Sequence, residues 1–209
     1  MLDTVILGPY ILSSPSSVLK GINNCVNMNY PNARNLMNIS LTTPSKIKDN
    51  EEYVVKKNSN SEIKKMRSEL GLPDSKSDRI LIYSKNSDLA HELSTSKNIR
   101  KAVQDWKSGK IKNSDGTRKT KFVVAANDSE DMKRAINGCT LTGLKENPDG
   151  SVSGYIYDIY NFDSHYTDMK DSTKNLNFVN KVACYLQKMG IIHNYQILVP
   201  ITIKTDIKS

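Results

Sequence analysis

A tight-turn signal flanked by two strand-like runs is the feature that most constrains the fold of this chain. The four residues Asn147–Gly150 are Asn, Pro, Asp and Gly, all of which favour turns. The run 139–144 precedes them, the longer run 151–162 follows, and β-branched or aromatic residues recur in both. Two such runs on either side of a turn predict a β-hairpin.

The rest of the C-terminal half alternates strand and helix signals. Asp128 or Ser129 can cap a short helix that runs through Ile136. Pro200 lies inside the last strand-like run and indicates a bend or an edge position there. Besides the hairpin, the expected elements are a strand over 122–126, this short helix, a helix over 176–189 that Gly190 ends, and a final strand over 195–203.

The N-terminal half contains mostly helix and loop signals. Ser59 and Glu62 match a capping box, which predicts a helix that continues to Leu70. A proline inside a helical pattern ends it, so Pro31 is expected to stop a first helix. The other expected elements are that first helix over 17–28, a polar loop over 38–60, a strand over 79–84, and a helical stretch over 87–108 interrupted near Thr95.

These signals predict an α+β protein of 209 residues, long enough to bury a substantial core. The expected organisation is an extended N-terminal arm over 1–17, a mainly helical region over 18–114, and an α+β domain over 115–209. The three cysteines, Cys25, Cys139 and Cys184, are too widely spaced for a metal-ligand pattern, and we expect free thiols.

The charge of the chain favours anionic partners. The net charge is +8, and hydrophobic residues make up 37% of the sequence. Nucleic acid, phosphorylated small molecules and anionic membrane surfaces all fit a basic protein. The basic segment 107–121 lacks the aromatic residues that stack on single-stranded bases, so we expect no nucleic-acid partner. This segment is a predicted loop that can attract an anionic head group.

A cluster of reactive side chains closes the longer strand of the hairpin. Asp158 and Tyr160 lie two residues apart, which places them on the same face of an extended strand. Asn161, Asp163 and His165 follow directly. Carboxylates and an imidazole can perform acid–base or metal chemistry. The alternative is structural, because polar groups are common where a strand ends in a turn.

Two sequence blocks in the C-terminal third resemble the catalytic domain of the colicin M family. They are Asp158-Ile159-Tyr160-Asn161-Phe162 and Tyr195-Gln196-Ile197-Leu198-Val199-Pro200, in this order, with the hairpin before the first block and a predicted helix between the two. The resemblance covers roughly residues 115–205. It implies a mostly antiparallel, curved and barrel-like sheet for the C-terminal domain.

Members of that family cleave lipid II between the undecaprenyl chain and the pyrophosphate, in the periplasm, with a divalent cation. Their motif is Asp-x-Tyr-Asp-Phe followed by His-Arg. Asp158 and Tyr160 match it directly, whereas Asn161 stands where the family has an Asp. His165 matches only with a deletion, and Tyr166 stands where Arg is expected. An amide cannot act as a base at neutral pH, so either Asp163 supplies the acidic role, or the chain uses different chemistry, or it is inactive.

The resemblance implies a metal-dependent phosphodiesterase that acts on lipid II as an antibacterial toxin. Asp158 and Asp163 are the expected ligands of Mg²⁺ or Ca²⁺, both of which prefer oxygen. His165 is the expected general acid or base, and Tyr160 can position a phosphate oxygen. The alternatives are a non-enzymatic binding module on the same scaffold and a toxin with another target.

The implied setting is the periplasm of a target cell, reached by secretion or delivery, at the outer face of its inner membrane. An immunity protein is an expected partner. Asp3–Leu7 also resembles a TonB box, a segment that binds a TonB-dependent import receptor by adding a strand to a sheet edge. An ordinary first strand is the alternative for this pentapeptide, because β-rich runs of this length are common.

Overall fold

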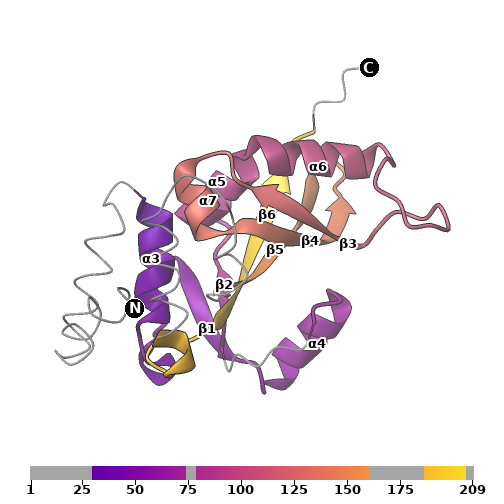
Figure 1. Ribbon diagram of the computed structural model, residues 1–209. Helices are drawn as coiled ribbons and strands as arrows, with labels where there is room; N and C mark the ends of the chain where they lie inside the picture. The colour runs from indigo at the N-terminus through magenta and orange to yellow at the C-terminus, as the bar shows by residue number, and fades with distance from the viewer. Residues whose placement is uncertain (1–29, 74–78, 161–185, 206–209) are drawn as a thin grey trace, which may run out of the picture.

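The computed structural model contains a six-stranded mixed sheet with helices on both faces (Figure 1). It describes residues 30–73, 79–160 and 186–205. This architecture confirms the α+β class. In chain order the elements are α3 (Pro31–Ser40), the short 3-10 helix η1 (Pro44–Lys46), β1 (Tyr53–Lys57), α4 (Ser61–Glu69), β2 (Arg79–Tyr83), α5 (Asp88–Thr95), α6 (Lys97–Lys107), β3 (Lys121–Ala126), α7 (Glu130–Ala135), β4 (Asn137–Glu146), β5 (Val152–Tyr160) and β6 (Tyr195–Ile203).

The strand order in the sheet is β1-β2-β6-β5-β4-β3. All neighbouring strands are antiparallel except β2 and β6, which run parallel. The sheet is not closed, because β1 and β3 lie at opposite edges and do not pair with each other. The expectation of a barrel-like sheet is therefore wrong. An antiparallel sheet of this size can remain open when helices cover its apolar faces.

The two faces of the sheet bury two separate cores. Helices α3, α5, α6 and α7 cover one face, where their apolar residues meet the side chains Leu141, Ile156, Ile197 and Val199. Helix α4 lies on the other face, below the sheet in Figure 1, and contributes Ile63 to a smaller core. None of the helices in the described ranges is long and apolar enough to cross a membrane.

The N-terminal half contributes strands as well as helices. β1 and β2 join the same sheet as the strands that follow residue 115, so the sheet includes residues from both sides of the predicted domain boundary. Pro31 begins helix α3, in agreement with the preference of proline for the first helical turn, and the first helix expected over 17–28 lies outside the described residues. The loop expected over 38–60 is also wrong, because this range contains the end of α3 and all of β1.

Local capping signals locate most helix ends. Ser96 caps the end of α5 and its hydroxyl accepts a hydrogen bond from the Ile99 amide of α6, which confirms the interruption near Thr95. Ser129 caps α7, as predicted. In α4 the cap is Asn60 rather than Ser59, and its side-chain oxygen accepts from the Glu62 amide.

The predicted hairpin and final strand are confirmed. β4 and β5 pair antiparallel across the turn Asn147–Gly150, and Gly150 has a positive φ of 80°. β6 lies between β5 and β2, but β2 pairs only with Gln196–Leu198. Pro200 therefore pairs with Tyr155 of β5 and removes no hydrogen bond to β2, which explains how a proline fits this strand.

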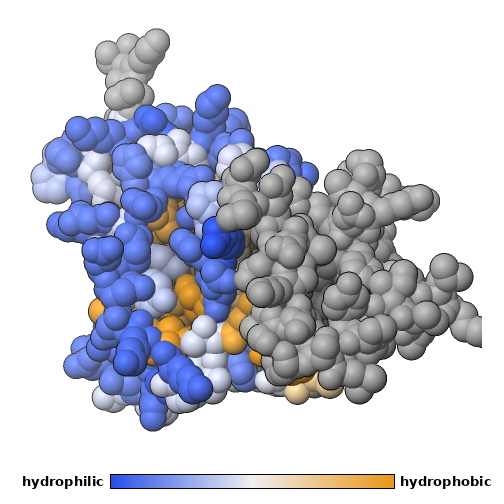
Figure 2. All heavy atoms as spheres, turned by 90° about the vertical axis from the view of Figure 1, so that its left-hand side faces the viewer, coloured by the Kyte–Doolittle hydropathy of each residue, from blue (hydrophilic) through white to orange (hydrophobic). Residues whose placement is uncertain are grey.

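The described residues visible in Figure 2 are mostly hydrophilic, and small apolar areas lie between their polar side chains. This agrees with the charged residues that make up 25% of the sequence. Apolar surface scattered between polar groups is normal for folded proteins and does not by itself mark a site.

A substitution at Gly143 tests the register shift in the pairing of β4 with β5. It has φ 62° at the register shift between Thr142 and Lys145, and an added Cβ would lie 2.6 Å from Leu70 Cδ2. We expect Gly143→Ala to lower the free energy of unfolding by about 1–2 kcal/mol, because the left-handed conformation is strained for alanine. Urea denaturation measures the change. Gly138→Ala in the same strand is the control, since no atom lies within 4 Å of its Cβ position; equal losses in the two variants would contradict this reading.

Candidate functional site

The end of β5 positions two of the predicted site residues. Asp158 and Tyr160 lie on the face of the sheet that contributes Ile156 to the larger core, as the alternation of the strand predicts. In the antiparallel pairing of β5 with β6, Asp158 is opposite Ile197 and Tyr160 is opposite Tyr195. The described residues of the first block of the colicin M resemblance, Asp158–Tyr160, therefore pair directly with the first three residues of the second block, Tyr195–Ile197.

The Asp158 carboxyl is half-buried. Its Oδ1 accepts a hydrogen bond from the backbone amide of Ile159 (2.9 Å). Burial raises the pKa of the Asp158 carboxyl to about 7, because removal from water disfavours the charged form, and the Ile159 hydrogen bond opposes this only in part. No ion pair to Asp158 occurs within the described ranges.

Cys139 of β4 is close enough to Asp158 to interact with it electrostatically. The thiol is buried and free, as predicted, and its Sγ lies 3.7 Å from the Val124 carbonyl oxygen. Burial raises the pKa of the Cys139 thiol to about 12, and the charge of Asp158 adds to the effect. The thiol is therefore neutral at physiological pH and is a poor nucleophile. Cys25 and Cys184 lie outside the described residues.

Tyr160 is part of the core rather than an exposed phenol. Its side chain is 8% exposed, and its ring stacks on Tyr195 at a centroid distance of 5.2 Å and an interplanar angle of 22°. The Tyr195 hydroxyl in turn donates to the Leu36 carbonyl oxygen (2.5 Å), which connects β6 to α3. Burial raises the pKa of both phenols above their usual value, so both stay neutral.

The remaining predicted site residues lie outside the described residues. These are Asn161, Asp163 and His165, together with the N-terminal segment Asp3–Leu7. Of the expected metal ligands, only Asp158 is described. In the described part of the chain no three His, Cys, Asp or Glu side chains form a group that could hold a metal ion. The site for Mg²⁺ or Ca²⁺ therefore stays a prediction.

The arrangement around Asp158 favours proton transfer. A carboxyl whose pKa is near the working pH can both accept and donate a proton, which is the property of an effective general acid–base catalyst. Strongly shifted titratable groups are concentrated at functional sites, although structural burial also produces them. Asp158 is therefore the described residue with the strongest chemical signature of a site.

A buried polar cluster lies on the opposite face of the same two strands. The Arg67 guanidinium of α4 donates to Gln196 Oε1 (2.5 Å), to Asn58 Oδ1 (3.2 Å) and to the Pro73 carbonyl oxygen. The Tyr157 hydroxyl donates to the same Gln196 oxygen (2.9 Å). Arg67 is 7% exposed, and all three of its acceptors are neutral oxygens. Within the described residues the Gln196 amide nitrogen has no hydrogen-bond partner.

Sequence reasoning missed this cluster. Arg67 and Gln196 are 129 residues apart, and neither belongs to a motif. The one available signal was Arg67 itself, because a basic residue on the apolar side of a short helix needs a buried partner. The cluster connects α4 to the centre of the sheet and fixes the orientation of the Gln196 side chain.

Part of the basic segment 107–121 has a structural role. Lys107 Nζ donates to the Gly150 carbonyl oxygen (2.6 Å) and to Thr205 Oγ1 (2.8 Å), so it holds the hairpin turn. Arg118 forms an ion pair with Glu146 (2.6 Å) and lies over the Trp106 ring. The segment is a loop, as predicted, with one isolated bridge between Lys112 and Arg118. Its attraction for anionic head groups stays a prediction.

Comparisons of the chain with protein-family models, with curated proteins and with solved structures give no match.

The raised pKa of Asp158 predicts a pH dependence of stability. The folded pKa of about 7 exceeds the usual value for an aspartic acid, so the folded state binds more protons than the unfolded state between these two values. The free energy of unfolding should therefore fall as pH rises through this window and level off above the folded pKa.

Asp158→Asn removes the titration and keeps the acceptor for the Ile159 amide. We expect the wild type to lose stability relative to Asp158→Asn between about pH 4 and about pH 7, and the difference to level off above that. Urea denaturation of both proteins at a series of pH values measures the difference. Parallel stability profiles across this range would show that Asp158 keeps an ordinary pKa.

The buried cluster predicts unequal costs for two conservative changes. Tyr157→Phe removes one hydrogen bond and should lower the free energy of unfolding by about 1 kcal/mol. Gln196→Leu removes the acceptor that Tyr157 and Arg67 share, and should cost about 2–3 kcal/mol, since a buried cation then loses a partner. Chemical denaturation of the two variants measures both. A smaller cost for Gln196→Leu than for Tyr157→Phe would contradict the shared-acceptor arrangement.

Proposed function

We propose that this protein is an antibacterial toxin of the colicin M type that hydrolyses lipid II at the undecaprenyl–pyrophosphate linkage. Water adds across that bond and releases undecaprenol from the pyrophosphoryl sugar–peptide. The observation that carries the proposal is the adjacency of β5 and β6, in which Asp158, Ile159 and Tyr160 of the first block pair with Ile197, Gln196 and Tyr195 of the second.

In the proposed reaction Asp158 transfers a proton. Its pKa of about 7 allows it to take a proton from water or to give one to the leaving oxygen near neutral pH. Asp163 and His165 supply further acid–base groups, and Asn161 offers an amide to a phosphate oxygen. The resemblance also implies Mg²⁺ or Ca²⁺, which Asp158 and Asp163 would hold and which would neutralise charge on the pyrophosphate. With the metal bound, Asp158 would stay ionised, and His165 would transfer the proton in its place.

The proposal includes a place of action and partners. Lipid II presents its head group at the outer face of the bacterial inner membrane, so the toxin acts in the periplasm of the target cell. The net charge of +8 favours an approach to this anionic surface. An immunity protein would protect the producing cell, and Asp3–Leu7 would engage a TonB-dependent receptor by strand addition.

A second candidate function is a non-enzymatic binding module on the same scaffold. It is favoured by the packing of Tyr160, which is 8% exposed and stacked on Tyr195, and which therefore presents little surface to a substrate. The replacement of the motif Asp by Asn161 also favours it. Such a module would bind an anionic partner without turning it over.

Purified lipid II tests the first candidate. We expect the protein to release undecaprenol in the presence of Mg²⁺, and a chelator to stop the release. Asp158→Asn should lower the rate at least about a hundredfold, because the amide cannot transfer a proton. Glu69→Gln is the control, since it removes an exposed carboxylate from α4, on the opposite face of the sheet, and should leave the rate unchanged.

A measurement in cells adds an independent outcome. Export of the chain to the periplasm should lyse bacteria, whereas its production in the cytoplasm should not. Binding of lipid II without release of undecaprenol would contradict the enzyme and support the non-enzymatic binding module. If the protein neither binds lipid II nor lyses cells from the periplasm, the colicin M reading is wrong.

A further inference from the structure

Strand β3 leaves one edge of the sheet open. It pairs with β4 on one side, and no other strand of the described residues pairs with its outer side. Lys121 is its one charged residue, and its Nζ donates to the Gly71 carbonyl oxygen beside α4 (2.6 Å). Val123 at the centre of the strand is 78% exposed. The backbone groups along an edge of this kind can pair with another strand.

The opposite edge of the sheet differs from β3. Edge strands are usually protected from pairing by charged side chains, prolines or bulges. β1 ends in Lys56 and Lys57, both exposed, whereas the last five residues of β3 are Phe, Val, Val, Ala and Ala. No register shift interrupts the pairing of β3 with β4. The central part of β3 therefore has none of these protective features, whereas the other edge strand, β1, is protected by its lysines.

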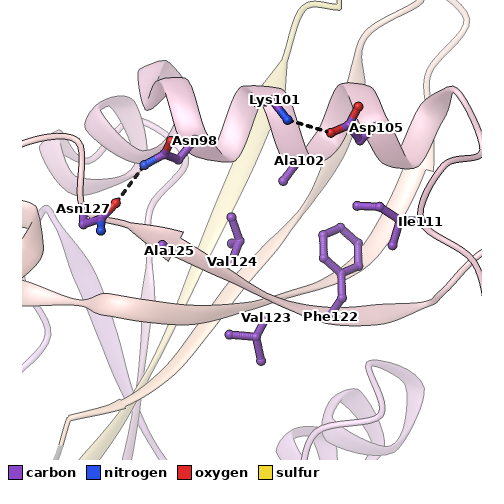
Figure 3. A pocket seen from close by; sticks show the side chains of 10 residues that line it. All are labelled: Asn98, Lys101, Ala102, Asp105, Ile111, Phe122, Val123, Val124, Ala125 and Asn127. Carbon is purple, nitrogen blue, oxygen red and sulfur yellow. Dashed lines mark hydrogen bonds and ion pairs between the residues drawn. The ribbon is translucent and has the colours of Figure 1, made fainter. Parts of the chain in front are cut away.

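A groove follows this edge between α6 and β3 (Figure 3). Its volume is about 440 Å³. Phe122 and Val124 point toward α6, and Val123 points to the other side of the strand, so the groove extends around the open edge. Ala102 of α6 and Ile111 add further apolar lining. An added strand would place its alternate side chains in this groove, over the outer edge of β3.

We propose that β3 pairs antiparallel with β3 of a second copy of this chain, with Val123 opposite Val123 on the two-fold axis. Residues directly opposite each other in an antiparallel pair have their side chains on the same face of the sheet. Two identical strands can satisfy this only when one residue is opposite the same residue of the other copy. In this register Phe122 is opposite Val124 of the partner, and both point to the helical face. The sheet then continues through both copies. The proposal is independent of the lipid II activity.

The charges along the seam fit a second copy. Lys101 Nζ and Asp105 Oδ2 line the groove and lie 3.2 Å apart. A two-fold axis reverses the direction of α6 in the second copy, so the lysine and the aspartate follow in opposite order along the two sides of the seam. Lys121 is opposite Ala125 of the partner, so the two Lys121 residues lie about 13 Å apart along the strands. The positive charge of each copy is therefore not concentrated at the seam, and salt screens the remainder.

Sedimentation equilibrium on the full chain tests the proposal. We expect a reversible monomer–dimer equilibrium across the micromolar to submillimolar range. Val123→Lys places like charges opposite each other and should raise the dimer dissociation constant at least about tenfold. Val123 is 78% exposed, so this variant should keep the thermal stability of the monomer. Val54→Lys on β1 is the matched control, because Val54 is also an exposed edge valine, and it should leave the dimer intact.

A cross-link tests the register. Val123→Cys, in a chain in which Cys25 and Cys184 are replaced by Ala, should form a disulfide-linked dimer on mild oxidation, and Val54→Cys should not. A monomer at all concentrations would overturn the proposal, as would a dimer that Val123→Lys does not weaken. A monomer that binds an extended apolar peptide at β3 would assign the edge to a different protein and would equally overturn it.

Discussion

The pairing of β5 with β6 is the interaction on which the rest of the structure depends. β6 also runs parallel to β2, and so it joins the two strands of the N-terminal half to the three strands that precede it in the C-terminal half. Ile197 and Val199 face the larger core, and Leu198 faces the smaller one. Both faces of this last strand are therefore covered, as strands in parallel pairs require. A change that displaces β6 would disturb both cores.

The same pairing explains why a carboxyl occupies an apolar setting. With Ile156 and Tyr160 on the core side of β5, the period of the strand places Asp158 on that side too. Removal from water then favours its neutral form. An ionised Asp158 lowers the stability of the fold at neutral pH, and proteins keep such groups mainly where a function needs them. The burial of Tyr160 favours a non-enzymatic binding module instead. Activity measurements on lipid II separate the enzyme from the binding module.

Sequence reasoning was accurate where neighbours within a few residues decide the structure. The hairpin, the break at Ser96 and the cap at Ser129 depend on turn and capping chemistry of this kind. It failed for β1, whose lysines and polar flanks resemble a loop, because pairing with β2 and not its own pattern stabilises this strand. It also failed for closure of the sheet, since the register of one hairpin does not say whether the two edge strands meet.

The candidate site divides along the same line. The two-residue spacing of Asp158 and Tyr160 predicted their common face, because alternation is a property of any extended strand. Nothing in the sequence indicated that Arg67 meets Gln196, or that Val123 lies on an open edge. Contacts between distant residues depend on how the strands are ordered and which faces the helices cover. The chain pattern therefore specified the strands and turns, while burial, the pKa of Asp158 and the free edge of β3 followed from packing.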